Sequence, residues 1–383
     1  MRKCILISLV GVALASCSTP NLRGTGDLGV VVERAAGRVM LVETTRRTAI
    51  GRVDGLGDLS HASVVFSRDG RYAYVFGRDG GLTKVDLLNA RIERRVIQSG
   101  NAIGGAISQD GRLVAAANYT PGGIRIFDAA SLALLSEVPT GAKVVGIADA
   151  PGNRFVFSTF ESGEIWIVDA SDPKRPVTTR IRNIGKQPYD GFVTPDGRHY
   201  IAGLYGEDGL ALVDLWHVEK GARRVLQGYG RGEEPLPVFK MPHLRGWAAA
   251  GRYLFLPAVG RHEVLVLDRV TWTEAARIAV RGQPVFAVAQ PGGRRVWVNF
   301  ALPDNGLVQV IDVDAMKVVK ELSPGRAVLH LEFTPRGEQA WISSRDDGAV
   351  VVYDTASYAE LARLPAASPS GIFLTSRGAM TGF

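Results

Sequence analysis

Cysteine is almost absent from this chain of 383 residues. Its two cysteines, Cys4 and Cys17, lie at the N-terminus, in a segment that we interpret below as an export signal. The folded domain then has no thiol, which excludes disulfide bonds, thiolate metal sites and cysteine nucleophiles. The motif Cys-x-x-Cys-His is also absent, which excludes covalent attachment of haem in the c-type manner.

Long apolar runs and blocks of like charge are absent as well. Beyond the N-terminus, no segment stays apolar for the ~18 residues that a membrane-spanning helix needs. Lys and Arg number 45 against 38 Asp and Glu, which gives a net charge of +7 spread along the chain. This modest excess favours an anionic small molecule over a long nucleic-acid groove, so we expect no nucleic-acid partner.

The first residues have the pattern of a targeting signal. Arg2 and Lys3 precede an apolar run from Ile5 to Ala15, which is typical of a secretory signal and too short to span a bilayer. The run ends in Leu14-Ala15-Ser16-Cys17, which resembles the lipobox of bacterial lipoproteins, where the cysteine is acylated after cleavage. We therefore predict a signal peptide at 1–16, a linker at 17–27 anchored through lipid on Cys17, and a periplasmic location. A plain signal peptide with a chance cysteine is the alternative.

The residue after the lipobox cysteine is Ser18. In such lipoproteins a residue other than Asp at this position favours sorting to the outer membrane. We therefore expect the anchor to lie in the outer membrane, and contact with the membrane to occur through the anchor only.

A short turn rich in Pro, Asp and Gly recurs through the rest of the chain. Its glycines are Gly70, Gly111, Gly152, Gly197, Gly251, Gly293, Gly337 and Gly378. A small apolar strand precedes each turn, and an alternating strand, an apolar run closing on Asp and a further strand follow it. Four strands per repeat are typical of one blade of a β-propeller. We therefore predict an all-β, eight-bladed β-propeller as a single domain at 28–383, because an array of β-sandwiches would not need so regular a period.

The last turn leaves too few residues to complete its blade. Gly378 is close to the C-terminus, whereas the valine-rich segments 29–33 and 39–43 precede the first turn. We expect these N-terminal strands to close the last blade, because this pairing removes exposed sheet edges. The longest interval, between Gly197 and Gly251, contains an additional polar loop at 228–237, which we consider a candidate lid.

The repeat also predicts which side chains surround the channel. Each inner strand begins about nine residues before its turn glycine, so positions nine to seven before the glycine form the rim of one mouth. Three of the six histidines, His61, His243 and His330, fall on this rim. The register and the neighbouring loops bring further polar residues to the same mouth: Arg78, Lys143, Glu161, Tyr189, Asp190 and Arg245.

Each of these histidines taken singly is more often a hydrogen-bonded structural residue. Together, three imidazoles with carboxylates and cations favour a binding pocket, because eight strand ends converge at the mouth of a propeller. Imidazole ligates iron or transfers protons, and Arg78, Lys143 and Arg245 are suited to pair carboxylates. The pattern therefore indicates a pocket for a metal-containing polyanion with a flat apolar body.

The stretch from His61 to Gly80 resembles the haem d1 domain of cytochrome cd1 nitrite reductase. In that family a histidine ahead of a Gly-Arg-Tyr strand and a Gly-Arg-Asp loop is the proximal iron ligand, which assigns the iron to His61. The segment 241–247 is similar to the family segment that carries a distal-pocket histidine, here His243, and the segments 228–235 and 328–330 are also similar to the family. The cofactor-binding residues expected are His61, Arg78, Lys143, Tyr189, His243, Arg245 and His330.

The chain departs from the reductase in two respects. It has no electron-delivering c-type haem, and the second distal histidine of the reductase is missing near 159–164, so we expect no nitrite reduction. A lipobox on a bare d1-type propeller is similar to the periplasmic haem d1 biosynthesis proteins of this family. The resemblance implies that the protein binds haem d1, or its late precursor dihydro-haem d1, at the channel mouth and takes part in its maturation.

Two roles stay open at this point. As an enzyme with a dehydrogenase-like activity on the tetrapyrrole periphery, the protein would use His61 as iron ligand and Asp190, Glu161 or His243 to move protons. As a carrier, it would hand the cofactor to nitrite reductase or to another haem d1 assembly protein. A propeller that only binds other proteins would not need a polar rim. The sequence leaves the oligomeric state open.

Overall fold

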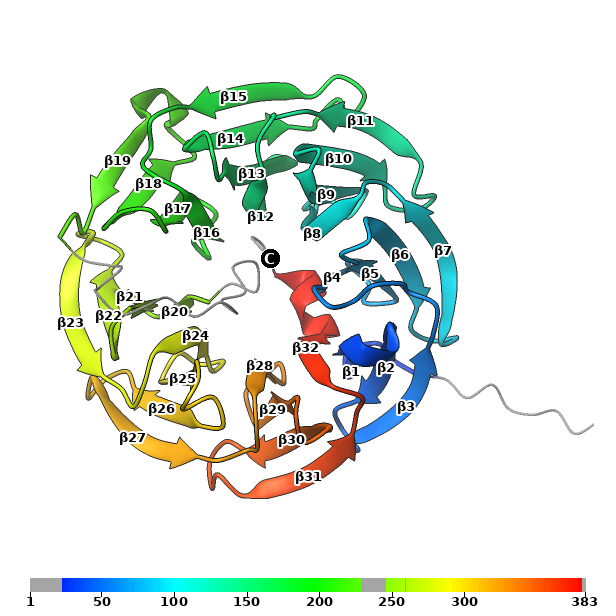
Figure 1. Ribbon diagram of the computed structural model, residues 1–383, viewed down its shortest axis with the longest axis vertical. Helices are drawn as coiled ribbons and strands as arrows, with labels where there is room; N and C mark the ends of the chain where they lie inside the picture. The colour runs from blue at the N-terminus through cyan, green and yellow to red at the C-terminus, as the bar shows by residue number, and fades with distance from the viewer. Residues whose placement is uncertain (1–22, 229–245, 259, 381–383) are drawn as a thin grey trace, which may run out of the picture.

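The computed structural model describes residues 23–228, 246–258 and 260–380, which form eight four-stranded antiparallel sheets arranged in a ring (Figure 1). The prediction of an all-β, eight-bladed β-propeller is confirmed. The described helices are short 3₁₀ turns: η1 (Arg34–Ala36), η2 (Val218–Lys220) and η3 (Thr375–Ala379). Within the described residues, no helix has the length and apolar character needed to cross a membrane.

Each blade contributes one strand to each of four concentric positions, and we number the blades 1 to 8 in the order of their inner strands. The inner strands are β4 (Ser63–Phe66), β8 (Asn101–Ile107), β12 (Val144–Ala150), β16 (Pro188–Val193), β20 (Ala248–Ala250), β24 (Pro284–Ala289), β28 (Val328–Phe333) and β32 (Pro369–Leu374). The second strands are β5 (Tyr72–Phe76), β9 (Leu113–Thr120), β13 (Arg154–Thr159), β17 (His199–Leu204), β21 (Tyr253–Ala258), β25 (Arg295–Phe300), β29 (Gln339–Ser344) and β1 (Leu28–Glu33).

The two outer positions complete the blades in the same order. The third strands are β6 (Gly81–Asp86), β10 (Gly123–Asp128), β14 (Glu164–Asp169), β18 (Leu210–Asp214), β22 (Glu263–Asp268), β26 (Val308–Asp312), β30 (Ala349–Asp354) and β2 (Arg38–Glu43). The outermost strands are β7 (Arg91–Ile97), β11 (Leu134–Val138), β15 (Val177–Ile181), β19 (Ala222–Val225), β23 (Thr273–Ala279), β27 (Lys317–Leu322), β31 (Glu360–Pro365) and β3 (Thr48–Val53).

The ring is closed by pairing the two ends of the chain, as predicted. The sheet order β3-β2-β1-β32 combines three N-terminal strands with the last strand of the chain, and the first and last colours of Figure 1 meet in this blade. Val30 of β1 lies opposite Phe373 of β32. The closure pairs the edge of β1 that would otherwise be exposed, which protects this edge from pairing with another chain.

The recurrent turns form as the Pro, Asp and Gly pattern predicts. In the first of them the Gly70 N–H donates to the Ser67 carbonyl at 2.8 Å, and the Asp69 carboxylate accepts the Arg71 N–H at 3.1 Å. Gly70 has φ of +66°, a left-handed conformation that glycine adopts without a steric cost. These turns lie at the end of the channel opposite to the predicted rim, because each follows its inner strand.

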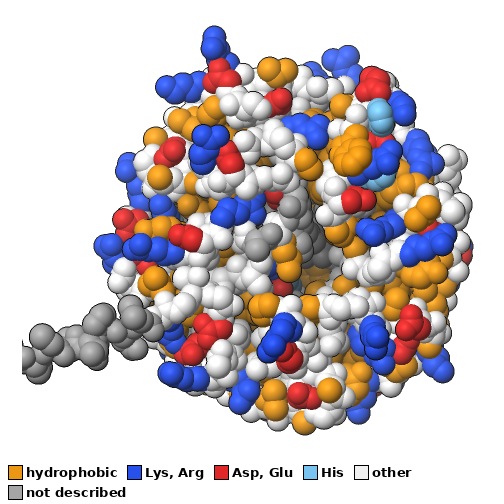
Figure 2. Space-filling model, turned by 180° about the vertical axis from the view of Figure 1, so that it is seen from behind, with side chains coloured by type: hydrophobic (Ala, Val, Ile, Leu, Met, Phe, Trp, Pro, Cys, Tyr) orange, Lys and Arg blue, Asp and Glu red, His pale blue; other side chains and the backbone are white. Residues whose placement is uncertain are grey.

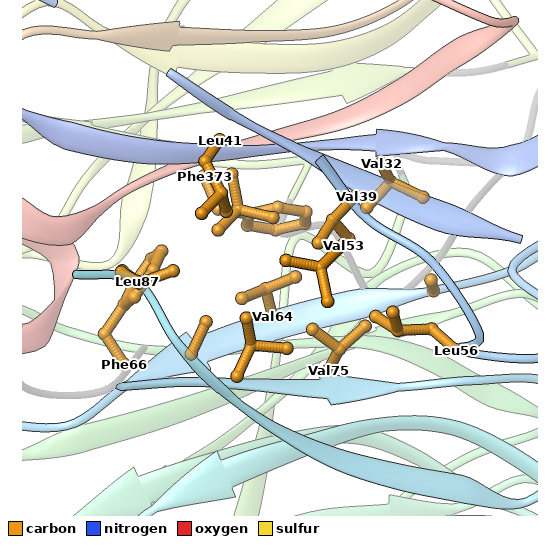
Figure 3. Packing of buried hydrophobic residues seen from close by; sticks show 14 of the residues in the cluster. Val32, Val39, Leu41, Val53, Leu56, Val64, Phe66, Val75, Leu87 and Phe373 are labelled. Atoms are coloured by element: carbon orange, nitrogen blue, oxygen red, sulfur yellow. The ribbon is translucent and has the colours of Figure 1, made fainter. Parts of the chain in front are cut away.

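Apolar side chains of neighbouring blades pack face to face and fill the space between the sheets. Figure 3 shows one such cluster, in which Val32 and Val39 of blade 8 lie near Val64 and Val75 of blade 1 and Phe373 of the last strand. The alternation of each strand sends these side chains to the two faces of its sheet. Packing therefore fixes the angular position of each blade and of the loops at its ends.

Part of the predicted linker contacts the propeller. Arg23 forms an ion pair with Glu43, and the Thr25 hydroxyl donates to the Asp69 carbonyl at 2.7 Å. Cys17 and the lipobox lie outside the described residues.

Candidate functional site

Two kinds of segment lie at one mouth of the channel. They are the segments that precede the inner strands and the loops that connect the second strand of each blade to its third strand. In blade 1 these are the segment before β4 and the loop at Gly77–Gly80, and they are joined by hydrogen bonds. The Arg78 N–H donates to the Asp58 carbonyl at 2.8 Å, and the Ser60 N–H donates to the Asp58 carboxylate at 2.8 Å. His61 and Arg78 therefore lie at the same mouth, as the repeat predicted.

A second contact fixes the loop that carries Arg78. The Asp79 carboxylate accepts a hydrogen bond of 2.6 Å from Arg95 of β7, and it also accepts the Gly81 N–H at 2.9 Å. Arg95 in turn donates to the Leu56 carbonyl at 3.1 Å. The loop and the segment before β4 are thus held by the same guanidinium, which orders the surroundings of His61 before any ligand binds.

His61 is partly buried two residues ahead of β4. Burial, followed by the positive charges of Arg78 and Arg34, lowers the pKa of this imidazole to about 4, and only Asp58 acts in the opposite direction. His61 is therefore neutral at physiological pH. An iron ligand must be the neutral form of imidazole, because the protonated ring has no nitrogen that can bind a metal.

Two arginines that the sequence analysis did not single out extend the positive charge beside His61: Arg34 acts on His61 together with Arg78, and Arg345 acts on Arg34. Arg34 opens η1 in blade 8 and Arg345 follows β29 in blade 7. Burial, and next the charge of Arg345, lowers the pKa of Arg34, which places these two guanidinium groups near each other. Arg345, Arg34 and Arg78 thus form a cationic arc over three consecutive blades. Because like charges repel, an anion between them would be favoured.

The next three blades present aromatic rings at the same mouth. Tyr189 lies 5.7 Å from Phe160 and 5.4 Å from Tyr205 between ring centroids. The ammonium of Lys143 lies 5.6 Å from the Phe160 centroid and 5.9 Å from the Tyr119 centroid. Tyr189 and Lys143 were predicted at the rim, whereas the other three aromatic residues were not. Together these four rings form an aromatic arc that continues the cationic arc around the channel.

The sequence contains a signal for the residues that were missed. Five residues share a position four residues before the first paired residue of the third strand of their blade: Arg34, Arg78, Tyr119, Phe160 and Arg345. Aligning the repeats on this position, and not only on the turn glycine, brings all five residues together. Tyr205 stands in the loop between the second and third strands of blade 4.

Lys143 and Glu161 form an ion pair within the aromatic arc. The ammonium lies 3.0 Å from the carboxylate, and the Lys143 backbone N–H donates to the same carboxylate at 2.7 Å. Burial raises the pKa of Glu161, but these contacts with Lys143 outweigh it and lower the pKa overall. Glu161 is therefore an ionised partner of Lys143, and a ligand carboxylate would share this ammonium with it.

His330 lies deeper than the rim. The residue is 2% exposed, and its Nδ1 accepts the Ile372 N–H at 3.0 Å. It packs between Phe286 and Phe373, with ring centroids at 6.4 and 5.4 Å. The structure therefore does not place His330 beside His61 at the open mouth.

The remaining predicted site residues are described in part or not at all. Asp190 follows Tyr189 in β16, but its side chain is outside what the structure describes. His243, Arg245 and the loop positions 229–237 lie outside the described residues. Their assignment to the site stays a prediction.

The described part of the chain contains no cluster of three or more His, Cys, Asp or Glu side chains that could hold a metal ion. Figure 2 shows a hollow at the centre of the face opposite to the view of Figure 1, with Lys and Arg side chains interspersed with Asp and Glu. No continuous basic band is visible on that face.

Comparison with known proteins identifies the family of this chain. The family described as "Cytochrome D1 heme domain" matches residues 23–378. Protein NirF of Stutzerimonas stutzeri is 56% identical over the full length of both chains, and Protein NirF of Pseudomonas aeruginosa is 58% identical over 97% of each chain. The solved structure of dihydro-heme d1 dehydrogenase NirN in complex with DHE is 27% identical and has a TM-score of 0.81, over 94% of this chain and 78% of that one. The chain therefore belongs to the cytochrome d1 haem domain family and, within it, to the NirF proteins.

Proposed function

We propose that this protein binds haem d1 or its late precursor dihydro-haem d1 at the mouth that contains His61, and takes part in the maturation of that cofactor. The observation that carries the proposal is a neutral imidazole beside Arg34 and Arg78, at a channel mouth that also contains Arg345 and the aromatic arc. Iron, carboxylates and a flat apolar ring system are the three features of a haem-type tetrapyrrole that these groups recognise separately.

Each part of the mouth matches one part of such a ligand. His61 would ligate the iron, and the cationic arc of Arg34, Arg78 and Arg345 would pair the peripheral carboxylates through charge-assisted hydrogen bonds. The aromatic arc offers ring faces and edges to the macrocycle, an arrangement worth about 0.5–1.5 kcal/mol per aromatic pair beyond the area buried. The solved neighbour, named a dihydro-heme d1 dehydrogenase and determined with DHE, supports a ligand of this class.

An enzyme changes the bound tetrapyrrole (the pigment) chemically, whereas a carrier releases it unchanged, and this difference distinguishes the two roles. The purified protein would be incubated with dihydro-haem d1, followed by mass spectrometry of the extracted pigment and by absorbance of the complex. A changed pigment mass identifies a catalytic step at the periphery, in which Asp190, Glu161 or His243 would move protons. An unchanged mass with a shifted spectrum identifies a carrier. If neither changes, the binding proposal itself fails.

We further propose that lipid on Cys17 tethers the protein to the outer membrane on its periplasmic side. The lipobox pattern and Ser18 support this location. A tethered propeller with its pigment at the channel mouth would deliver the cofactor to nitrite reductase or to another haem d1 assembly protein. Pull-down of such partners by pigment-loaded protein, and not by the pigment-free form, would test this transfer.

A further inference from the structure

A cavity of about 500 Å³ lies in the channel towards the end opposite to the His61 mouth. Four inner strands, β16, β20, β24 and β28, form its walls, and η3 lies across it. The residues of the turns that follow these strands, such as Pro195 and Pro335, also line it, which places it on the turn side. The cationic and aromatic arcs do not contribute to its lining.

The cavity contains a compact polar cluster. Glu332 of β28 accepts a hydrogen bond of 2.7 Å from Nε of Arg377 in η3. Burial, the largest effect, raises the pKa of Glu332 although Arg377 lowers it. The Arg377 guanidinium also lies 5.4 Å from the centroid of Phe373. The pair carries one positive and one negative charge, so the cluster is neutral when both groups are ionised.

His330 adds an oriented donor to this cluster. It lies two residues before Glu332 in β28, and both residues line the cavity. Because Nδ1 accepts the Ile372 N–H, the ring proton resides on Nε2, and burial lowers the pKa of His330 to about 3. Nε2 has no acceptor among the described residues. Nε2 is not among the buried nitrogen atoms that lack a partner, and His330 lines the cavity, so a ligand acceptor in the cavity could take the hydrogen bond of this N–H.

The other walls are apolar and leave room. Phe192, Trp247 and Phe333 supply large apolar surfaces. Small side chains line the walls formed by β20 and β24: Ala248, Ala249, Ala287 and Ala289. The volume lies within the ~300–1,000 Å³ of small-molecule pockets, which are typically apolar with a few convergent polar groups.

The wall formed by η3 is fixed in place by hydrogen bonds to β1 of blade 8 and to the turn of blade 1. The Thr375 hydroxyl donates to the Leu28 carbonyl at 2.9 Å, and Arg68 donates to the Gly378 carbonyl at 2.8 Å. The cavity is therefore preformed, and a ligand would not have to order this segment when it binds.

We infer that this cavity is a second ligand site, which takes an uncharged aromatic carbonyl compound. The carbonyl oxygen accepts the hydrogen bond of His330 Nε2, and the aromatic body lies against Trp247, Phe192 and the alanine wall. A net charge on the ligand is excluded by the same cluster, because Glu332 and Arg377 already neutralise each other and a third buried charge would have no partner.

Three probes that share one ring system test the ligand class: 2-acetylnaphthalene, 2-ethylnaphthalene and 2-naphthoate. Binding would be followed by quenching of tryptophan fluorescence, because Trp247 lines the cavity. We expect the ketone to bind at least tenfold more tightly than either the hydrocarbon, which lacks the acceptor, or the carboxylate, which is charged. Equal affinity of the ketone and either analogue would overturn the inference.

Two variants locate the binding. Ala249→Leu fills the cavity from β20, keeps the polar cluster and should reduce ketone affinity at least tenfold, whereas Ala356→Leu, in an exposed turn, should not change it. His330→Phe should reduce the affinity for the ketone and not that for the hydrocarbon. Ketone affinity that is unchanged in Ala249→Leu would refute the site. Pigment binding at His61 should be the same in Ala249→Leu and wild type, so this test is independent of the proposed function.

Discussion

The three arginines of the cationic arc should contribute unequally to pigment binding, because they differ in exposure. Arg34 is partly buried and its pKa is lowered first by burial and then by Arg345. Arg78 is exposed, and Arg345, with 29% of its side chain exposed, already donates a hydrogen bond of 2.7 Å to Asp346. A ligand carboxylate would therefore find the strongest and least screened partner in Arg34.

The magnitudes follow from the usual energies of such pairs. Partly desolvated, charge-assisted hydrogen bonds contribute about 1.5–3 kcal/mol, so Arg34→Gln should weaken binding about 10- to 150-fold. Exposed ion pairs contribute about 0–1 kcal/mol, so Arg78→Gln should weaken it by no more than about fivefold. Arg345→Gln should fall between the two, because its carboxylate partner competes with the ligand.

The assay is absorbance titration of isolated haem d1 into each variant at low and high NaCl concentration. Arg112→Gln is the matched control, because Arg112 is 77% exposed and paired with Asp110 at the turn end of the channel. Wild-type affinity should fall with salt, and the salt dependence should weaken most in Arg34→Gln. Equal losses in all three rim variants, or a loss in Arg112→Gln as large as in Arg34→Gln, would refute the assignment.

Three further predictions concern His61, acid stability and the anchor. His61→Ala should abolish the ligand-field shift of bound pigment while leaving the circular dichroism of the propeller unchanged, and an unaltered pigment spectrum would remove His61 as iron ligand. The pKa values of His61 and His330 are lowered to about 4 and about 3, so below about pH 6.5 the unfolded chain binds protons that the folded pigment-free protein does not. Urea unfolding should therefore show stability falling as pH decreases from 7 to 5, at up to about 1.4 kcal/mol per pH unit for each histidine, and constant stability over this range would contradict both shifts. Cys17→Ala should release the protein from the membrane fraction with unchanged pigment affinity, and retention of that variant in the membrane would contradict the lipid anchor.

The architecture could be predicted from the sequence because its signals are local. Turn chemistry around residues such as Asp69 and Gly70 recurs once per blade, and a turn of this kind depends on a few neighbouring residues. The closure by β1 and β32 followed from counting strands, since one blade was short at the C-terminus and strands were in excess at the N-terminus. The identity of the family followed from the stretch that begins at His61.

Some residues at the His61 mouth were not placed by the sequence analysis, and the reason is geometric. Positions were counted from the turn glycine, which fixes the start of each inner strand but not the loops beyond the second strand. These loops differ in length, from the four residues between Glu33 and Arg38 to the six between Gly203 and Leu210. Arg34, Arg345 and Tyr205 therefore could not be placed by that count, although their types are those that a tetrapyrrole site requires.

His330 shows how small a shift along a strand changes the role of a residue. It stands two positions farther along its inner strand than His61, which corresponds to a depth of about 7 Å in the channel. The pairing of β28 with β29 is also irregular between Val328 and Leu331, so the regular alternation does not predict the direction of this side chain. At that depth the imidazole contacts Phe286 and Phe373 and lines the cavity that contains Glu332 and Arg377. The sequence register therefore placed His330 near the rim, whereas in the folded channel its Nε2–H is a donor for the second ligand site that we propose.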